Sequence, residues 1–167
     1  HVDIDPCSIS KNVHVDIPIV GDAKNVLNLM LKEFAKGKYT FDNQMRENWV
    51  KQIESWKEKR ALRAVENGKM SPQEVIEHIY NRTKNMDTIV ATEVGQHQMW
   101  TAQLYKFNEP RKFVTSGGLG TMGFGFPAAI GAQIAAPGKL VFDIAGDGSF
   151  QMNIQELMTC IDYKIPI

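Results

Sequence analysis

The pattern of apolar and polar positions predicts that strands and helices alternate along most of this chain. Short apolar runs at 87–92, 112–115 and 140–145 are typical of buried strands. Helical patterns lie around them, at 72–83, after residue 98, at 128–136 and at 151–163. Such alternation is typical of an α/β fold in which helices cover both faces of a parallel sheet.

The first 35 residues predict a smaller strand–helix unit. Residues 1–5 and 17–20 have short strand patterns, and a helix is expected from Ala23 to Phe34 with Asp22 as its N-cap. Asp3 and Asp22 end predicted strands, where carboxylates of dinucleotide-binding folds accept hydrogen bonds from ribose hydroxyls. A surface carboxylate and a helix cap are the simpler interpretation, which the residues alone favour.

Residues 36–70 are more polar and are expected to connect two units. The segment 37–43 has the composition of a linker, and 44–67 is typical of a solvated amphipathic helix that packs on a neighbouring domain. A capping box at Ser71 and Glu74, with Pro72 between them, starts the next helix. The predicted organisation is therefore 1–35, 36–70 and 71–167.

The composition of the chain argues against several classes of function. Lys plus Arg and Asp plus Glu are equal at 19 each, so no basic surface for nucleic acid is implied. Cys7 and Cys160 match no metal-binding spacing and are expected to be free thiols in a reducing compartment. No apolar run approaches the roughly 20 residues of a membrane span, and no signal peptide is visible. Both ends look like cuts through strands, so we expect a segment of a longer protein.

The turn Gly146-Asp147-Gly148 is the first candidate site, because it joins a buried strand to a helix. Its glycines let the backbone turn sharply and approach a ligand, and Asp147 offers the hard oxygen that Mg²⁺ prefers. The start of the following helix adds unpaired N–H groups. A metal–diphosphate site is one interpretation, and an ordinary strand-to-helix turn is the other.

The segment 93–98 is expected at the same edge of the sheet, where ligands of parallel sheets bind. Gln96 and His97 could donate hydrogen bonds to a phosphate there. A structural or exposed histidine is the alternative.

A glycine-rich loop at 116–127 follows the next predicted strand. Its Gly118-x-Gly120-x-x-Gly123 spacing formally matches the dinucleotide fingerprint. The match is weakened because further Gly and Pro residues are expected to delay the helix, and because the acidic Asp143 lies within a predicted strand. Met122 suggests contact with a flat apolar ring, although methionine also fills gaps.

Together these motifs resemble the large catalytic subunit of acetolactate synthase (acetohydroxyacid synthase), a thiamine-diphosphate enzyme. Residues 93–100, 116–127 and 146–157 carry the resemblance, which extends to 3–6 and 18–23. It implies a truncated thiamine-diphosphate-binding fold over 71–167. The preceding residues 1–35 would be the end of a central FAD-binding-type domain.

The resemblance also implies roles for single residues. Asp147 would be the Mg²⁺ ligand, and Asp3 and Asp22 would contact FAD. Thiamine diphosphate would be contacted by Gln96, His97, Gly120, Thr121, Met122, Gly146, Gly148 and Ser149. No catalytic residue is implied within the chain, because the family's activating glutamate lies in a domain outside it. The asparagine pair that completes the metal site would follow Ile167, so the segment alone is expected to be inactive.

The implied activity is the condensation of two pyruvates, or of pyruvate and 2-ketobutyrate, with loss of CO₂. The products would be 2-acetolactate or 2-aceto-2-hydroxybutyrate, in branched-chain amino-acid biosynthesis. A homodimer or homotetramer, a small regulatory subunit, and a cytoplasmic, plastid or mitochondrial location are also implied, without nucleic acid or membrane. The alternatives are another thiamine-diphosphate carboligase or 2-ketoacid decarboxylase, a non-catalytic cofactor-binding module, and a nicotinamide Rossmann domain.

Overall fold

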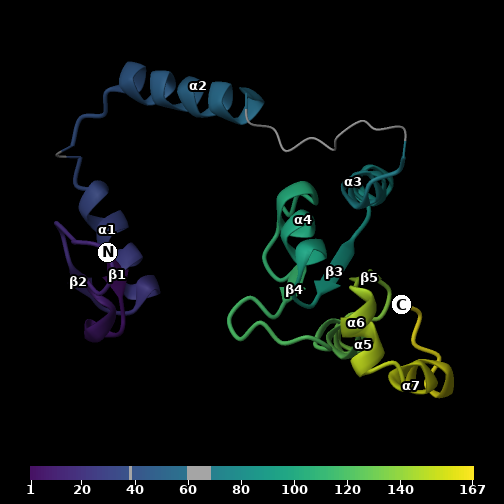
Figure 1. Ribbon diagram of the computed structural model, residues 1–167. Helices are drawn as coiled ribbons and strands as arrows, with labels where there is room; N and C mark the ends of the chain where they lie inside the picture. The colour runs from purple at the N-terminus through teal and green to yellow at the C-terminus, as the bar shows by residue number, and fades with distance from the viewer. Residues whose placement is uncertain (38, 60–68) are drawn as a thin grey trace. The chain divides into compact units, whose positions relative to one another are not determined.

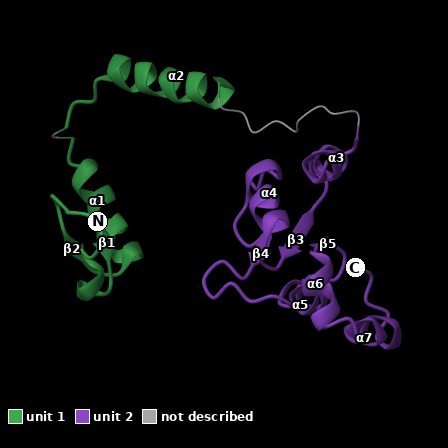
Figure 2. Cartoon of the chain, in the orientation of Figure 1, with its two compact units in different colours: residues 1–60 green, residues 61–167 purple. Residues whose placement is uncertain are grey.

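The computed structural model describes residues 1–37, 39–59 and 69–167. The chain divides into two compact units, residues 1–60 and 61–167 (Figure 2). No helix in the described ranges has the length and apolar character needed to cross a membrane.

In the first unit, β1 (Val2–Asp3) and β2 (Ile19–Val20) pair in parallel, and α1 (Ala23–Phe34) follows them. The Asp22 carboxylate accepts a hydrogen bond from the Asn25 backbone N–H at 3.0 Å, which confirms the predicted N-cap. The first strand is shorter than predicted. Asp5 caps the short helix η1 (Pro6–Ser8) by accepting from the Cys7 N–H at 2.9 Å, and this turns the chain out of the strand.

The predicted amphipathic helix is α2 (Asn43–Lys59), and positions 60–67 of the prediction lie outside the described residues. Its Trp49 and Trp56 rings meet edge to face, with centroids 5.5 Å apart. Both rings stay about half exposed within this unit. Their expected packing on a neighbouring domain stays a prediction.

The second unit is a three-stranded parallel sheet in the order β4-β3-β5 with helices before and between the strands. The elements run α3 (Pro72–Thr83), β3 (Thr88–Thr92), α4 (Gln96–Leu104), β4 (Phe113–Thr115), α5 (Gly125–Ala135), β5 (Leu140–Ile144), α6 (Asp147–Met152) and α7 (Glu156–Asp162). The predicted α/β class is therefore confirmed.

The side chains of the central strand β3 alternate between two cores. Ile89 and Ala91 pack with Ala129 of α5 on one face. Val90 packs with Ile76 of α3 and with Tyr105, just after α4, on the other face. All six residues are buried, so β3 is covered on both sides, as its continuous apolar run predicts. Figure 1 shows how the helices of this unit lie around its three strands.

Two helix boundaries differ from the prediction. Helix α5 begins at Gly125 instead of residue 128, because Pro127 lies in its first turn, where a missing N–H breaks no helical hydrogen bond. The single helix expected over 151–163 is two helices, α6 and α7. The break lies at Asn153, which leaves helical geometry and donates its side-chain amide to the Gly123 carbonyl at 2.7 Å.

Candidate cofactor-binding site

The three predicted loops leave the sheet at one edge. Thr92, Thr115 and Ile144 end their strands side by side, because Thr92 pairs in register with both of the others. The Thr92 hydroxyl donates to the Thr115 hydroxyl at 2.8 Å, and the Gln98 side chain donates to the same oxygen at 2.8 Å. The side chains therefore tie the ends of the strands to α4.

His97 connects the loop after β3 to the loop after β5. A Cβ built on Gly95 would stand 3.0 Å from its Cε1, and one built on Gly146 would stand 3.1 Å from the same atom. Gly95 also has a φ of +146°, a backbone conformation that residues with a Cβ rarely adopt. The close approach of these three residues therefore favours glycine at both positions, most strongly at Gly95.

The start of α4 is open to an anion. Gly95 is its N-cap and supplies no side-chain hydrogen bond to the first turn. The first backbone N–H groups of a helix have no intrahelical acceptors and carry a partial positive charge, which suits a phosphate. Gln96 is exposed at this start, and the Nε2 of His97 donates to the Glu93 carboxylate at 3.1 Å.

The glycine-rich loop is closed by Ser116, which is buried. Its hydroxyl accepts from the Thr121 N–H at 2.9 Å, and its carbonyl accepts from the Gly120 N–H at 3.1 Å. Gly120 has a φ of +71°, which favours glycine at this turn. Thr121 and Leu119 are exposed.

Met122 brings the glycine-rich loop into contact with the predicted metal turn, Gly146-Asp147-Gly148. Its Cε would be 3.4 Å from a Cβ built on Gly148, an ordinary van der Waals contact. The Met122 side chain is about half exposed at 45%. It lines an open cavity of about 320 Å³ that also includes Ser116, Gly117, Gly118, Thr121, Phe124 and Asn153. The cavity beside the unbranched, apolar Met122 side chain has room for part of a flat ring.

Asp147 is exposed as the first residue of α6, and Ser149 behind it is buried. Within residues 1–37, 39–59 and 69–167, no three His, Cys, Asp or Glu side chains gather as a metal site. Mg²⁺ is often held by one or two carboxylates together with substrate phosphates. The single carboxylate of Asp147 therefore fits Mg²⁺ when a diphosphate supplies further oxygens.

The sequence-based prediction missed two carboxyl groups behind these loops. Glu93 is fully buried directly after β3, and Asp143 lies within β5 beside it. Both contact Gly125 at the start of α5. The signal was an acidic residue at the end of an apolar run and another inside one, which is unusual in a buried strand.

Asp3 and Asp22 belong to the first unit and have local partners. Asp3 accepts from the Asp5 N–H at 2.9 Å and lies 3.4 Å from the His1 ring nitrogen, and Asp22 caps α1. These contacts agree with the simpler interpretation of both residues. Their contact with FAD stays a prediction.

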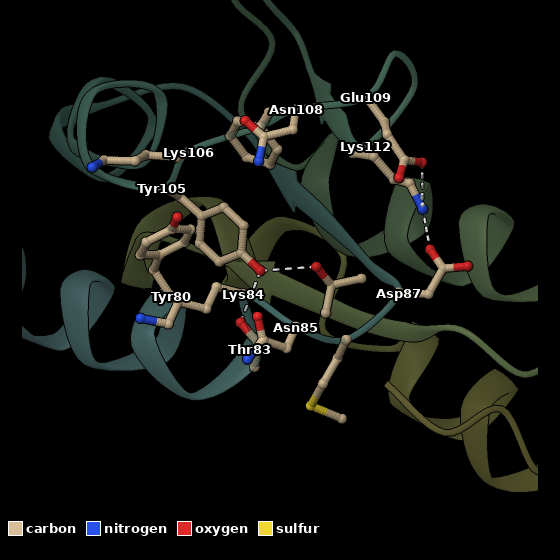
Figure 3. A pocket seen from close by; sticks show the side chains of 13 residues that line it. Tyr80, Thr83, Lys84, Asn85, Asp87, Tyr105, Lys106, Asn108, Glu109 and Lys112 are labelled. Carbon is tan, nitrogen blue, oxygen red and sulfur yellow. Dashed lines mark hydrogen bonds and ion pairs between the residues drawn. The ribbon is translucent and has the colours of Figure 1, made fainter.

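A larger cavity of about 440 Å³ opens near the amino-terminal end of β3, away from the predicted site residues (Figure 3). Several of its polar side chains are paired with one another or with neighbouring residues. The Tyr105 hydroxyl bonds Thr83 and Thr88, each at 2.8 Å, and Asp87 pairs with Lys112 and Lys139. These contacts join α3 and the beginnings of the strands, so we assign the lining a structural role.

The comparison with known proteins agrees with the geometry. Residues 93–167 match the family model of the thiamine pyrophosphate enzyme C-terminal TPP binding domain. The whole chain is 48% identical to the acetolactate synthase isozyme 3 large subunit of Escherichia coli (strain K12) and covers 29% of it. Over its whole length the chain is thus similar to a segment of acetolactate synthase large subunits. It is also 50% identical to the acetolactate synthase large subunit of Haemophilus influenzae, again over all of the chain and 29% of the relative.

A third relative, the probable acetolactate synthase large subunit of Methanococcus aeolicus, is 44% identical over the whole chain, which covers 30% of it. The chain thus spans less than a third of the length of the curated relatives that it matches. The family resemblance stated from three motifs is confirmed. The roles of single residues remain predictions, which the contacts of His97 and Met122 support.

Proposed function

We propose that the protein containing this segment condenses two 2-ketoacids with loss of CO₂, and that the segment holds its thiamine diphosphate and Mg²⁺. The observation that carries the proposal is the meeting of three separate loops. His97 lies against Gly146, and Met122 lies against Gly148, so the loop after β5 touches both other loops at the edge of the sheet. The preferred substrates would be pyruvate alone, or pyruvate and 2-ketobutyrate.

Each loop has a proposed part in binding. Asp147 holds Mg²⁺ against the diphosphate, while His97 and the open start of α4 donate hydrogen bonds to the phosphate oxygens. Met122 supports the cofactor rings from its exposed side, and the Gly120 carbonyl accepts from the aminopyrimidine. When bound, thiamine diphosphate supplies the electron sink that decarboxylation and carbon–carbon bond formation require.

The further assignments belong to the same proposal. Asp3 and Asp22 stand at or just after the carboxyl ends of two parallel strands, where a nucleotide such as FAD binds in α/β folds. The relatives are named large subunits, and this name supports the existence of a small regulatory subunit. We also propose that the complete protein forms a homodimer or homotetramer. We place the protein in the cytoplasm, or in a plastid or mitochondrion of a eukaryote.

Product analysis of the complete protein tests this proposal. Incubation with pyruvate, with and without 2-ketobutyrate, should yield the two acetohydroxyacids. Acetaldehyde as the main product would indicate a decarboxylase instead. Cofactor binding with no turnover of either ketoacid would favour the non-catalytic module, and NAD binding in place of thiamine diphosphate would indicate a nicotinamide domain.

The Asp147→Ala variant tests the metal role. Loss of its carboxylate should lower acetolactate formation on the order of 100-fold and raise the Mg²⁺ concentration needed for half activity. Asp162→Ala, which removes an exposed carboxylate at the end of α7, is the matched control and should keep wild-type activity. Full activity of Asp147→Ala would contradict the assigned role.

A further inference from the structure

Glu93 and Asp143 form a buried acidic pair behind the candidate site. Glu93 has no exposed surface, and the Asp143 side chain is mostly covered as well. Buried carboxylates are rare unless they are paired with a cation or bonded fully. This pair therefore needs a physical explanation.

The two side chains converge on Gly125. A Cβ built on Gly125 would stand 2.7 Å from the Asp143 Oδ1 and 2.8 Å from the Glu93 Cδ. The Asp143 Oδ1 therefore lies no farther from the Glu93 Cδ than the sum of these two distances. Gly125 opens α5, so it presents backbone and no side chain between them.

One oxygen of each carboxyl group lacks a partner. Within the described part of the chain, the Glu93 Oε1 and the Asp143 Oδ1 are buried without a hydrogen bond. The other Glu93 oxygen, Oε2, accepts from the His97 Nε2 at 3.1 Å. A proton between the two free oxygens would satisfy both, because a protonated carboxyl donates and an ionised one accepts.

The electrostatics favour such a proton. Burial, and then the negative charge of Glu93, raise the pKa of Asp143 to about 7. Glu93, from the end of β3, is the charged group that acts on Asp143 within the described residues, and His97 from α4 faces the far side of Glu93. Helix α5 contributes the backbone of Gly125 at this point.

We propose that Glu93 and Asp143 share one proton, and that this pair orients His97 toward the diphosphate of the cofactor. Asp143 donates to the Glu93 Oε1, and the Glu93 Oε2 accepts from the His97 Nε2–H. The His97 Nδ1, which would lie 3.3 Å from a Cβ on Gly146, is then directed toward the loop after β5. The inference rests on the proposed function, because it assigns the anion that His97 meets.

The net charge of the Glu93–Asp143 pair matters for binding an anion at His97. With one proton shared, a single negative charge remains beside His97. An imidazole with both nitrogens protonated can donate from Nε2 to Glu93 and from Nδ1 to a phosphate oxygen, whereas a ring with its proton on Nε2 alone would face the anion with a lone pair. Two negative charges would instead repel the diphosphate. Glu93 is in this sense a positioning residue.

A double-mutant cycle in the complete protein tests the positioning. The dissociation constant of thiamine diphosphate is measured by calorimetry at fixed Mg²⁺ for wild type, Glu93→Gln, His97→Ala and the double variant. Glu93→Gln should weaken binding about tenfold, as loss of a ligand-orienting partner does. In the His97→Ala background the same change should have little further effect.

An equal loss in both backgrounds would show that Glu93 does not act through His97 and would overturn the inference. Glu77→Gln, on the exposed side of α3, is the matched control and should leave affinity unchanged. A wild-type protein that binds no thiamine diphosphate would refute the proposed function instead. The shared proton would then still be testable by spectroscopy.

Infrared difference spectra against pH test the proton itself, without cofactor or turnover. Wild type should show a protonated-carboxyl C=O band that disappears with a midpoint near pH 7, and Asp143→Asn should lack this band. In Glu93→Gln the midpoint should fall, since the neighbouring negative charge is gone. A band that persists in Asp143→Asn, or an unmoved midpoint in Glu93→Gln, would overturn the shared proton.

Discussion

The imidazole of His97 lies directly against the backbone of Gly146. A Cβ on Gly146 would stand 3.1 Å from the Cε1 and 3.3 Å from the Nδ1 of the ring, closer than most real contacts. The two residues come from loops that follow different strands of the sheet. This contact sets how the open start of α4 faces the loop that carries Asp147.

We therefore expect Gly146→Ala to weaken thiamine-diphosphate binding while the fold persists. The backbone of Gly146, at φ −87° and ψ 152°, accepts alanine, so the methyl group acts only by displacing His97. A loss of affinity of about tenfold would correspond to about 1.4 kcal/mol. Calorimetric titration with the cofactor and Mg²⁺ measures it.

Gly131→Ala, within α5, is the control for this variant, because nothing lies within 4 Å of a Cβ at position 131. It should keep wild-type affinity. Unchanged affinity of Gly146→Ala for thiamine diphosphate would contradict the prediction, because the His97 ring could then be displaced without weakening cofactor binding.

Gly123→Ala should lower the stability of the second unit. Gly123 has a φ of +82°, and a Cβ there would stand 2.8 Å from the Asn153 Nδ2 and 3.1 Å from the Met152 Cβ. Left-handed backbone at a non-glycine residue costs about 1–3 kcal/mol, and the overlap adds to this. The midpoint of thermal unfolding should fall, and a midpoint equal to that of the wild type would contradict the strain.

The Tyr105 hydroxyl is expected to stabilise the junction of α3 and β3. It bonds the Thr83 and Thr88 hydroxyls in a buried site, as Figure 3 shows. Tyr105→Phe leaves these threonines without that partner and should cost about 1–3 kcal/mol of unfolding free energy. Urea unfolding measures the change. Tyr163→Phe removes an exposed hydroxyl and should leave the transition where it was.

Asp87 gives a pH-dependent contribution to stability. Hydrogen bonds from Lys112, and then from Lys139, hold the pKa of its carboxyl below the usual value. The stability gained from a lowered pKa is fully present above the unfolded pKa, near about 3.9, and is lost as the pH falls through the folded pKa. Wild type should therefore unfold at higher temperature than Asp87→Asn at neutral pH, with a difference that shrinks in acid.

Thermal unfolding of both proteins over a series of pH values checks this sign. Glu109→Gln is a suitable control, because its carboxylate lies 3.5 Å from the Lys112 ammonium and is largely exposed. A difference between wild type and Asp87→Asn that stays constant into acid would contradict the ion-pair explanation.

Much of the fold follows from local patterns. Asp22 and Ser71 predict the starts of α1 and α3, because their side chains accept hydrogen bonds from backbone N–H groups only three residues away. The apolar run at 87–92 predicts β3, since a strand buried on both faces needs apolar residues throughout. Three motifs likewise identify the family and place their loops at one edge.

Other features depend on residues that are distant in the sequence. The break between α6 and α7 needs the bond from Asn153 to Gly123, which no local pattern reports. Glu93 and Asp143 also leave no room for a side chain at Gly125, where α5 begins. The long-range bond of Asn153 thus explains the unexpected break, whereas the earlier start of α5 reflects the place of Pro127 in its first turn.

The sequence by itself determined most of the strands and helices, the resemblance to acetolactate synthase large subunits, and the residue types that a metal–diphosphate site requires, because these depend on local spacing. Only the tertiary structure decided that His97 meets Gly146, that Met122 meets Gly148, and that two carboxyl groups share a buried space behind them. The physical reason is that parallel pairing brings the ends of separate strands together. Contacts, burial and charge at that edge therefore arise between residues that the chain keeps far apart.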